Sequence, residues 1–282
     1  MIPGATSGEI VLHVRDVSIA RDGTRVLDHV SFDVVDRIRE GCITGQVVSL
    51  LGPSGIGKTT LLRVLAGLDR PARGEVKGPG GTPLDAKSVG IVFQHYPLLA
   101  HRTVEENLVV AGRVGGLAEE RARMRARELM ERVAIADRAG FYPAQLSGGQ
   151  RQRAAIAQQL VLPRRVLLLD EPFSGLDPAA LADVTELVTE VANDHELNTV
   201  VIVTHDVRAA LRVSDTILLL GKSANDGSKG AGVRATYDLV DLGLAWEHGK
   251  RAPHAVAELE HEIELRFRET ERPSGARRLS VL

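Results

Sequence analysis

One stretch restricts the fold of this chain more than any other: residues 47–67, where an apolar run, a glycine-rich turn and a helical pattern follow one another. Val47–Leu51 has the length of a strand and the apolar character of a central strand buried on both faces. Lys58–Gly67 has the pattern of a helix that ends at a glycine. A buried strand that turns through glycines directly into a helix predicts an α/β fold.

The turn between this strand and this helix has the chemistry of a phosphate-binding loop. Gly52–Thr59 matches the pattern G-x-x-x-x-G-K-[ST]. Glycines let backbone N–H groups point at phosphate oxygens, and the start of the helix adds the positive end of a dipole. A chance glycine turn is the alternative, and the flanking strand and helix argue against it. The predicted nucleotide-binding residues are Gly52, Pro53, Ser54, Gly55, Ile56, Gly57, Lys58, Thr59 and Thr60.

Two of these side chains have specific expected roles. Lys58 is expected to reach the β- and γ-phosphates of a nucleotide, and Thr59 is expected to bind Mg²⁺.

The rest of the chain alternates between strand and helix patterns. Residues 9–35 contain two alternating runs around an Asp-Gly turn signal, which predicts a β-hairpin. The order of the later segments predicts a largely parallel core sheet. We predict strands over 89–93, 166–169, 199–203 and 216–220, helices over 117–133, 151–162, 178–193 and 206–213, loops over 36–46 and 222–233, and turns with short strands over 70–88.

Two carboxylates follow one of these predicted buried strands. Val166–Leu169 is apolar, and Asp170 and Glu171 come directly after it. Asp170 suits a ligand on the Mg²⁺ side of a nucleotide, and Glu171 suits polarisation of an attacking water. Alone, this pattern is also that of a strand ending in two solvated acids. Downstream of a phosphate-binding loop, the catalytic interpretation is favoured.

A third motif, Leu146–Gln150, has the sequence LSGGQ and precedes a predicted helix. Its serine and glycines could form a simple helix cap, or a second site for an anion at a helix start. Together with the two preceding motifs, this string resembles the signature of the ATP-binding cassette (ABC) ATPases. The resemblance implies a P-loop NTPase cassette with an N-terminal antiparallel β-subdomain and an inserted α-helical subdomain at about 95–155.

The resemblance also implies how ATP and Mg²⁺ are held. In this family the signature of one subunit covers the nucleotide bound by the phosphate loop of another, so a head-to-tail homodimer with two ATP molecules is expected. The signature residues that this assigns to nucleotide binding are Ser147, Gly148, Gly149 and Gln150.

Three further positions match landmarks of the same family. Gln94 follows the predicted strand 89–93 and matches the glutamine that senses Mg²⁺ and the γ-phosphate. Asp177 ends a loop that crosses the dimer interface in that family, and His205 matches the histidine that contacts the γ-phosphate. The resemblance therefore assigns catalysis to Lys58, Gln94, Glu171 and His205, and the metal to Thr59, Gln94 and Asp170.

The resemblance covers residues 9–221, which we expect to form the ATPase domain. Residues 1–8 are small and polar and are expected to be disordered. Residues 222–282 form a C-terminal extension in which 253–269 has the spacing of an amphipathic helix.

The sequence departs from the family pattern in two places. The family usually stacks adenine on an aromatic side chain between its first two strands, and residues 17–25 contain none. Arg21 lies near that place and could stack through its guanidinium plane, so weak discrimination between ATP and GTP is expected. Residues 36–44, which include Cys42, are longer than the usual connection, and a tolerated loop insertion is favoured over a redox role.

Composition narrows the function classes. With 35 basic and 37 acidic residues, the chain has no overall field that favours nucleic acid. The arginines of 121–132 alternate with acids and predict a solvated helix face, with no aromatic platform for nucleic acid beside it. One cysteine and no apolar run of about 18 residues predict a protein of a reducing compartment without a membrane span.

These observations predict an ATPase located in the cytoplasm, peripheral on the inner face of the cell membrane, that powers separate transmembrane permease subunits. The resemblance is greatest to nitrate-, sulfonate- and taurine-type importers, which also implies an indirect link to an extracytoplasmic solute-binding protein. The segment 94–108 is the expected contact with a permease helix. ATPases of export or lipid-trafficking systems remain an alternative, and ATPases acting on ribosomes or DNA are a weaker one.

Overall fold

The computed structural model describes residues 5–39, 45–84, 89–176, 178–192, 199–222, 230–245 and 253–271. Its strands form one nine-stranded sheet in the order β4-β1-β2-β9-β8-β3-β7-β6-β5. The strands are β1 (Ala5–Arg21), β2 (Thr24–Arg39), β3 (Gln46–Leu51), β4 (Arg73–Lys77), β5 (Val89–Val92), β6 (Val166–Asp170), β7 (Thr199–Thr204), β8 (Thr216–Lys222) and β9 (Ala231–Asp238). The helices are α1 (Lys58–Leu65), α2 (Val104–Val114), α3 (Glu119–Arg132), α4 (Gly148–Leu160), α5 (Pro178–Ala192), α6 (Val207–Val213) and α7 (Pro253–Glu271).

The centre of the sheet is parallel, as the sequence predicted. Strands β8, β3, β7, β6 and β5 pair as parallel neighbours. Every residue of β3, β6 and β7 is buried, because both faces of this region are covered. The carboxyl ends of these strands therefore meet at one edge of the sheet.

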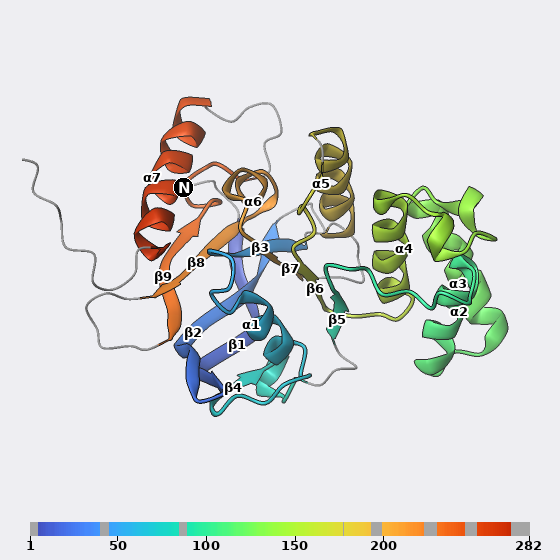
Figure 1. The fold of residues 1–282 in the computed structure, drawn as a ribbon, viewed down its shortest axis with the longest axis horizontal. Helices are drawn as coiled ribbons and strands as arrows, with labels where there is room; N and C mark the ends of the chain where they lie inside the picture. The colour runs from blue at the N-terminus through green and yellow to red at the C-terminus, as the bar shows by residue number, and fades with distance from the viewer. Residues whose placement is uncertain are drawn as a thin grey trace, which may run out of the picture.

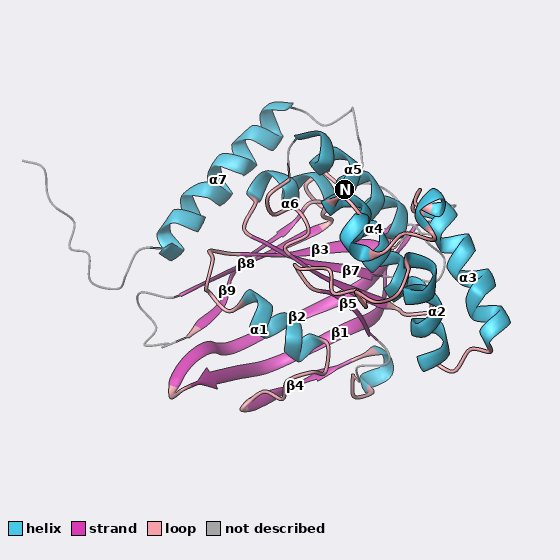
Figure 2. Cartoon of the chain, turned by 45° about the vertical axis from the view of Figure 1, so that its right-hand side comes forward, coloured by secondary structure: helices cyan, strands magenta, loops and turns pink. Residues whose placement is uncertain are grey.

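Helices cover the two faces of the parallel region differently. Helix α1 lies on one face, between the parallel strands and the hairpin strands, while α5, α6 and α7 lie on the other (Figure 2). Leu61, Leu62 and Leu65 of α1 share a buried cluster with apolar residues of β1 and β2. This packing fixes the start of α1 against the sheet.

The N-terminal hairpin is present, with β1 and β2 antiparallel around Asp22-Gly23 and β4 beside β1. Two boundaries of the prediction are wrong. Residues 5–8, predicted to be disordered, belong to β1, while residues 1–4 lie outside the described residues. Residues 36–39, predicted as loop, extend β2, because Arg37 to Arg39 pair with the start of β1. Cys42 lies outside the described residues.

Strand β9 was predicted only as the end of a loop, and it changes the domain boundary. It pairs antiparallel with β8 and joins β2 through one parallel pair, Leu27 with Ala231. A boundary after residue 221 therefore divides a sheet that the structure keeps continuous. Helix α7 confirms the amphipathic helix predicted over 253–269, and it buries Leu259 and Ile263 against α6 and β8.

Helices α2, α3 and α4 form a separate body at one side of the sheet (Figure 1). They fall within the region predicted to be a helical subdomain, although α4 continues to Leu160. The prediction missed α2, which begins with a capping box between Thr103 and Glu106. None of the helices in the described residues is long and apolar enough to cross a membrane.

Candidate nucleotide-binding and catalytic site

The predicted site residues gather at the carboxyl edge of the parallel strands. Leu51 at the end of β3 lies beside Thr204 of β7, and Asp170 at the end of β6 lies beside Val203. The residues that follow these strand ends are Gly52, Glu171 and His205, so the strand register brings all three to one place. The sequence predicted each of them separately, and the parallel sheet explains why they meet.

Two glycines of the phosphate loop adopt backbone angles that other residues disfavour. Gly55 has φ 76° and Gly57 has φ 110°. A Cβ atom on Gly57 would lie 2.8 Å from Val26 Cγ1, and one on Gly52 would lie 2.9 Å from the carbonyl oxygen of Leu220. The loop can therefore reach this shape only with glycine at these positions.

Lys58 is the first residue of α1 and is 5% exposed. Its Nζ donates to the carbonyl oxygens of Gly52 at 2.8 Å and Pro53 at 3.0 Å. It also lies 3.2 Å from Glu171 Oε1. The ammonium group is thus held over its own loop by oxygen atoms, in the position where phosphate oxygens could replace them.

Glu171 occupies an unusual backbone conformation, with φ 50°. Its N–H donates to the carbonyl oxygen of Val203 at 2.8 Å, which ties the turn after β6 to β7. Its second carboxylate oxygen lies 2.9 Å from His205 Nδ1. Lys58, Glu171 and His205 therefore form a connected chain of polar groups, and the strained conformation is the kind found at functional sites.

The predicted magnesium ligands also form a pair. Thr59 Oγ1 donates to Asp170 Oδ1 at 3.1 Å. Burial raises the pKa of the Asp170 carboxyl, and the hydrogen bond from Thr59 opposes that effect. A hydroxyl and one carboxylate match a Mg²⁺ site that is completed by phosphates and water. Among the described residues there is no group of three or more His, Cys, Asp or Glu side chains that could hold a metal ion.

Gln94 lies at the same edge, two residues after the end of β5. Val92 pairs with Leu169, so Gln94 and Glu171 each follow the end of one of two neighbouring strands. The next residue, His95, was not predicted as part of the site and lies beside Gln94 near the same edge. Its position beside Gln94 is the one signal in the sequence that could have indicated it.

The signature residues form a second, separate structure. Ser147 caps α4 by accepting from the N–H of Gln150, and the Gln150 side chain accepts from the N–H of Ser147. Gly148 and Gly149 have nothing within 4 Å of an added Cβ. Helix α4 belongs to the helical body, away from α1 (Figure 1), so the chain does not bring its own signature to its own phosphate loop.

Two other predicted residues stand apart from this edge. Arg21, at the end of β1, is half exposed and reaches Asp69 Oδ2 with its Nη2 at 3.4 Å. Asp177 lies outside the described residues.

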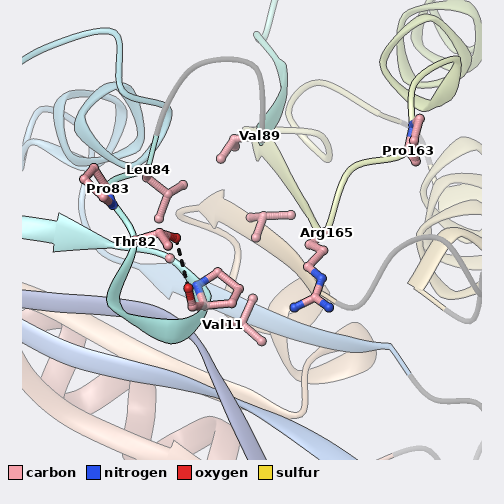
Figure 3. Close-up of a pocket in the computed structure, with 10 residues that line it drawn as sticks. Val11, Thr82, Pro83, Leu84, Val89, Pro163 and Arg165 are labelled. Atoms are coloured by element: carbon pink, nitrogen blue, oxygen red, sulfur yellow. Dashed lines mark hydrogen bonds between the residues drawn. The ribbon is translucent and has the colours of Figure 1, made fainter.

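A cavity of about 260 Å³ lies elsewhere (Figure 3). Val89 and Val166, which begin β5 and β6, line it, so it lies at the opposite edge of the sheet from the site above. Its walls are mainly apolar side chains and prolines, with Arg165 at one side paired to Glu9. It contains none of the residues that the sequence assigned to nucleotide, metal or catalysis.

Comparison with known proteins gives a consistent answer. The family model described as ABC transporter matches residues 35–174. The sulfate/thiosulfate import ATP-binding protein CysA of Gloeobacter violaceus is 43% identical over 206 residues, 70% of this chain and 60% of that protein. The probable amino-acid ABC transporter ATP-binding protein y4tH of Sinorhizobium fredii is 38% identical over 211 residues, 68% of this chain and 82% of that protein. This chain spans only 54% to 64% of the length of the CysA proteins that it matches.

Solved structures agree with the sequence relatives. The cbiO1 protein of Clostridium perfringens, described as part of the ABC transporter complex cbiONQ, aligns with a TM-score of 0.71 at 25% identity, covering 91% of this chain and 99% of that one. A dimeric post-hydrolysis state of the ATP-binding cassette MJ0796, bound to ADP and Pi, aligns with a TM-score of 0.65 at 28% identity, covering 81% of this chain and 98% of that one. The α/β cassette fold predicted from the sequence is confirmed.

Proposed function

Because this chain belongs to the ABC transporter family, we propose that it binds ATP with Mg²⁺ and hydrolyses it to power movement of a small solute through separate permease subunits. The observation that carries the proposal is the arrangement at the carboxyl edge of the sheet. Glu171 contacts both Lys58 and His205, and Thr59 lies in contact with Asp170. Each motif by itself could be a chance glycine turn, a strand that ends in solvated acids or a simple helix cap. None of these explanations accounts for the contacts between the motifs.

The geometry supports a division of roles. Lys58 would leave the Glu171 carboxylate, 3.2 Å away, when the β- and γ-phosphates of ATP take its place. Glu171 would then be free to orient the attacking water, held from the other side by His205. Thr59 and Asp170 would hold Mg²⁺, which supplies neutralisation of the phosphate charge. Gln94 would contact the metal and the γ-phosphate.

The signature residues act on a second chain in this proposal. Ser147 and Gly148 are exposed and Gly149 is half-buried at the start of α4, which lies away from α1 and the phosphate loop of the same chain (Figure 1). A head-to-tail homodimer would set each signature on the nucleotide of the partner, with Gln150 and Asp177 at the same interface. Such an arrangement fits the dimeric ADP- and Pi-bound cassette that this chain resembles.

Import is the direction of transport that the relatives favour. The proteins named above are an import ATP-binding protein for sulfate or thiosulfate and a probable amino-acid transporter subunit. We therefore propose import of a small solute, with the chain on the cytoplasmic face of the membrane beneath its permease and a solute-binding protein acting on the other side. Nitrate, sulfonate or taurine as the transported anion stays a prediction.

Two measurements test the proposal. Purified chain should release phosphate from ATP in the presence of Mg²⁺ and not with EDTA. Chain expressed with an affinity tag in its native host should co-purify with a polytopic membrane protein when membranes are solubilised. Recovery of ribosomes or DNA in place of a membrane protein would contradict the transport role while leaving the ATPase intact.

A further inference from the structure

A buried glutamine connects the signature helix to the turn that carries Glu171. Gln152 lies on α4, five residues after Ser147, and is 1% exposed. Its Nε2 donates to the carbonyl oxygen of Pro172 at 3.0 Å. Pro172 directly follows Glu171, so one hydrogen bond joins the two halves of the site within a single chain.

This bond completes the restraint of a strained turn. Glu171 has φ 50°, a conformation that persists only where the surroundings hold it. Its N–H is held by Val203 of β7, and its carbonyl oxygen accepts from the N–H of Ser174 at 3.2 Å. The third restraint, on the next carbonyl, comes from Gln152. Of the three, only this last one is supplied by the helical body.

Burial of the Gln152 amide costs free energy, and what the amide provides in return is its contact with the turn. Gln152 Oε1 is buried and has no hydrogen-bond partner, which makes the amide costly in comparison with an apolar side chain of the same size. Pro172 has no N–H, so its carbonyl is the one backbone polar group that this residue must satisfy when buried. The amide therefore has its value in the contact with the turn.

We propose that Gln152 is a positioning residue for Glu171, and that it transmits contact between the signature and a partner's nucleotide to the carboxylate that orients water. This inference rests on the proposed function. A partner's nucleotide would bind at the first turn of α4, and Gln152 lies about one helical turn beyond that point. A shift of α4 would move the Pro172 carbonyl, and Glu171 with it.

Two variants separate positioning from packing. Gln152→Met keeps the length and removes both the donor and the orphaned oxygen, so the melting temperature should be unchanged or higher. Its kcat for ATP should fall about tenfold or more, because small misplacement of a reacting group has large effects. The KM for ATP should change less than twofold, since the phosphate loop is untouched.

Gln152→Glu adds a readout in pH. A protonated carboxyl can still donate to Pro172, whereas a carboxylate repels that carbonyl oxygen. The ratio of its kcat to that of the natural chain should rise as pH falls, and Gln152→Met should show no such rise. The matched control is Gln158→Glu, on the same helix, where the amide reaches the Asn107 carbonyl at 3.5 Å in the helical body. Its kcat should stay within twofold of the natural chain at every pH.

Three results would overturn the inference. One is a kcat of Gln152→Met within twofold of the natural chain. A second is equal loss in the Gln158→Glu control. A third is a fall in kcat that comes with a lower melting temperature and a raised KM, which would indicate a structural role. The natural chain is assayed first: absence of Mg²⁺-dependent turnover in it would count against the proposed function, whereas normal turnover with an unaffected Gln152→Met counts against the inference alone.

Discussion

The two halves of the nucleotide site differ in how complete they are within one chain. In the phosphate-loop half, Lys58, Asp170 and Glu171 are largely buried and bonded to one another or to the loop. In the signature half, the Ser147 side chain bonds to Gln150 in the capping box, and two glycines with open space around them follow it. The side chains of the phosphate-loop half already contact one another within one chain. The signature half instead presents exposed backbone at the start of α4.

This difference has a physical cause. The phosphate-loop half lies where the parallel strands end, so strand register places Asp170 and Glu171, while the glycine loop and the packing of α1 place Lys58 and Thr59. The signature half lies at the start of α4, where Leu146 is buried in the core but Ser147 and Gly148 are exposed. In the proposed dimer, a second molecule would supply the contact that completes the site.

The largest expected effect is on ATP hydrolysis, when the phosphate-loop half is changed. Glu171→Gln should lower the rate of ATP hydrolysis by about 10²- to 10⁴-fold, because the amide cannot accept a proton from water. Binding of ATP should persist, since Lys58 loses a competing carboxylate. The measurement is single-turnover hydrolysis together with size-exclusion chromatography, where the variant should accumulate dimer with ATP. Near-normal turnover would show that another residue orients the water.

The next prediction combines one chain that is defective in the phosphate-loop half with another that is defective in the signature half. Lys58→Ala should abolish ATP binding, and Gly149→Asp should leave ATP binding intact but stop turnover, because its carboxylate would face the partner's phosphates. Nothing within 4 Å of an added Cβ at Gly149 obstructs the folded chain. An equal mixture of the two variants should recover about a quarter of normal turnover, since half of the dimers then hold one intact composite site.

Failure of the mixture to recover any activity, while each variant still forms dimers, would mean that the two halves do not meet across a head-to-tail interface. Full activity of Gly149→Asp alone would remove the signature from the site.

Local motifs and the order of parallel strands explain why the predicted residues of the phosphate-loop half lie together, while their roles stay a prediction. The string G-x-x-x-x-G-K-[ST] and the two acids after β6 are each contiguous, so no long-range information was needed. Strand β9 was missed because the glycines around it match a linker, and its pairing with β8 and β2 is a tertiary effect.

The contacts between distant segments could not be predicted in the same way. Gln152 and Pro172 are 20 residues apart, and nothing in either local sequence indicates that one satisfies the other. The positive φ of Glu171 is likewise imposed by β7 and by the turn, not by any preference of glutamate. Helix α2, in contrast, had a readable signal in the capping box of Thr103 and Glu106.

A smaller effect should be seen on stability. Burial raises the pKa of Asp170, so its charged form disfavours the folded state. Asp170→Asn should raise the melting temperature of the nucleotide-free chain by roughly 2–4 °C, equivalent to about 1 kcal/mol for a chain of this size. The gain should be full at neutral pH and should vanish as pH falls below about 4, where the carboxyl is protonated in the unfolded chain as well.

Calorimetry across this pH range checks the Asp170→Asn prediction. Addition of ATP with Mg²⁺ should reverse the order of the two proteins, because only the natural chain has the carboxylate that supports the metal. A lower melting temperature for Asp170→Asn at neutral pH would show that Asp170 stabilises the fold instead.

The smallest expected effect concerns the base of the nucleotide, because the phosphate-loop half is expected to contact the base far less than the phosphates. Arg21 is the residue nearest the expected place, and its exposed side chain reaches Asp69 at 3.4 Å. GTP should therefore be hydrolysed within a hundredfold of the rate for ATP.

Arg21→Tyr should strengthen binding of both nucleotides by about three- to tenfold through stacking. Arg25→Tyr, an equally exposed site just past the hairpin turn, is the control and should bind like the natural chain. A GTP rate below a hundredth of the ATP rate would mean that groups other than a stacking side chain recognise the base. The phosphate-loop half would then select between bases as well as bind the phosphates.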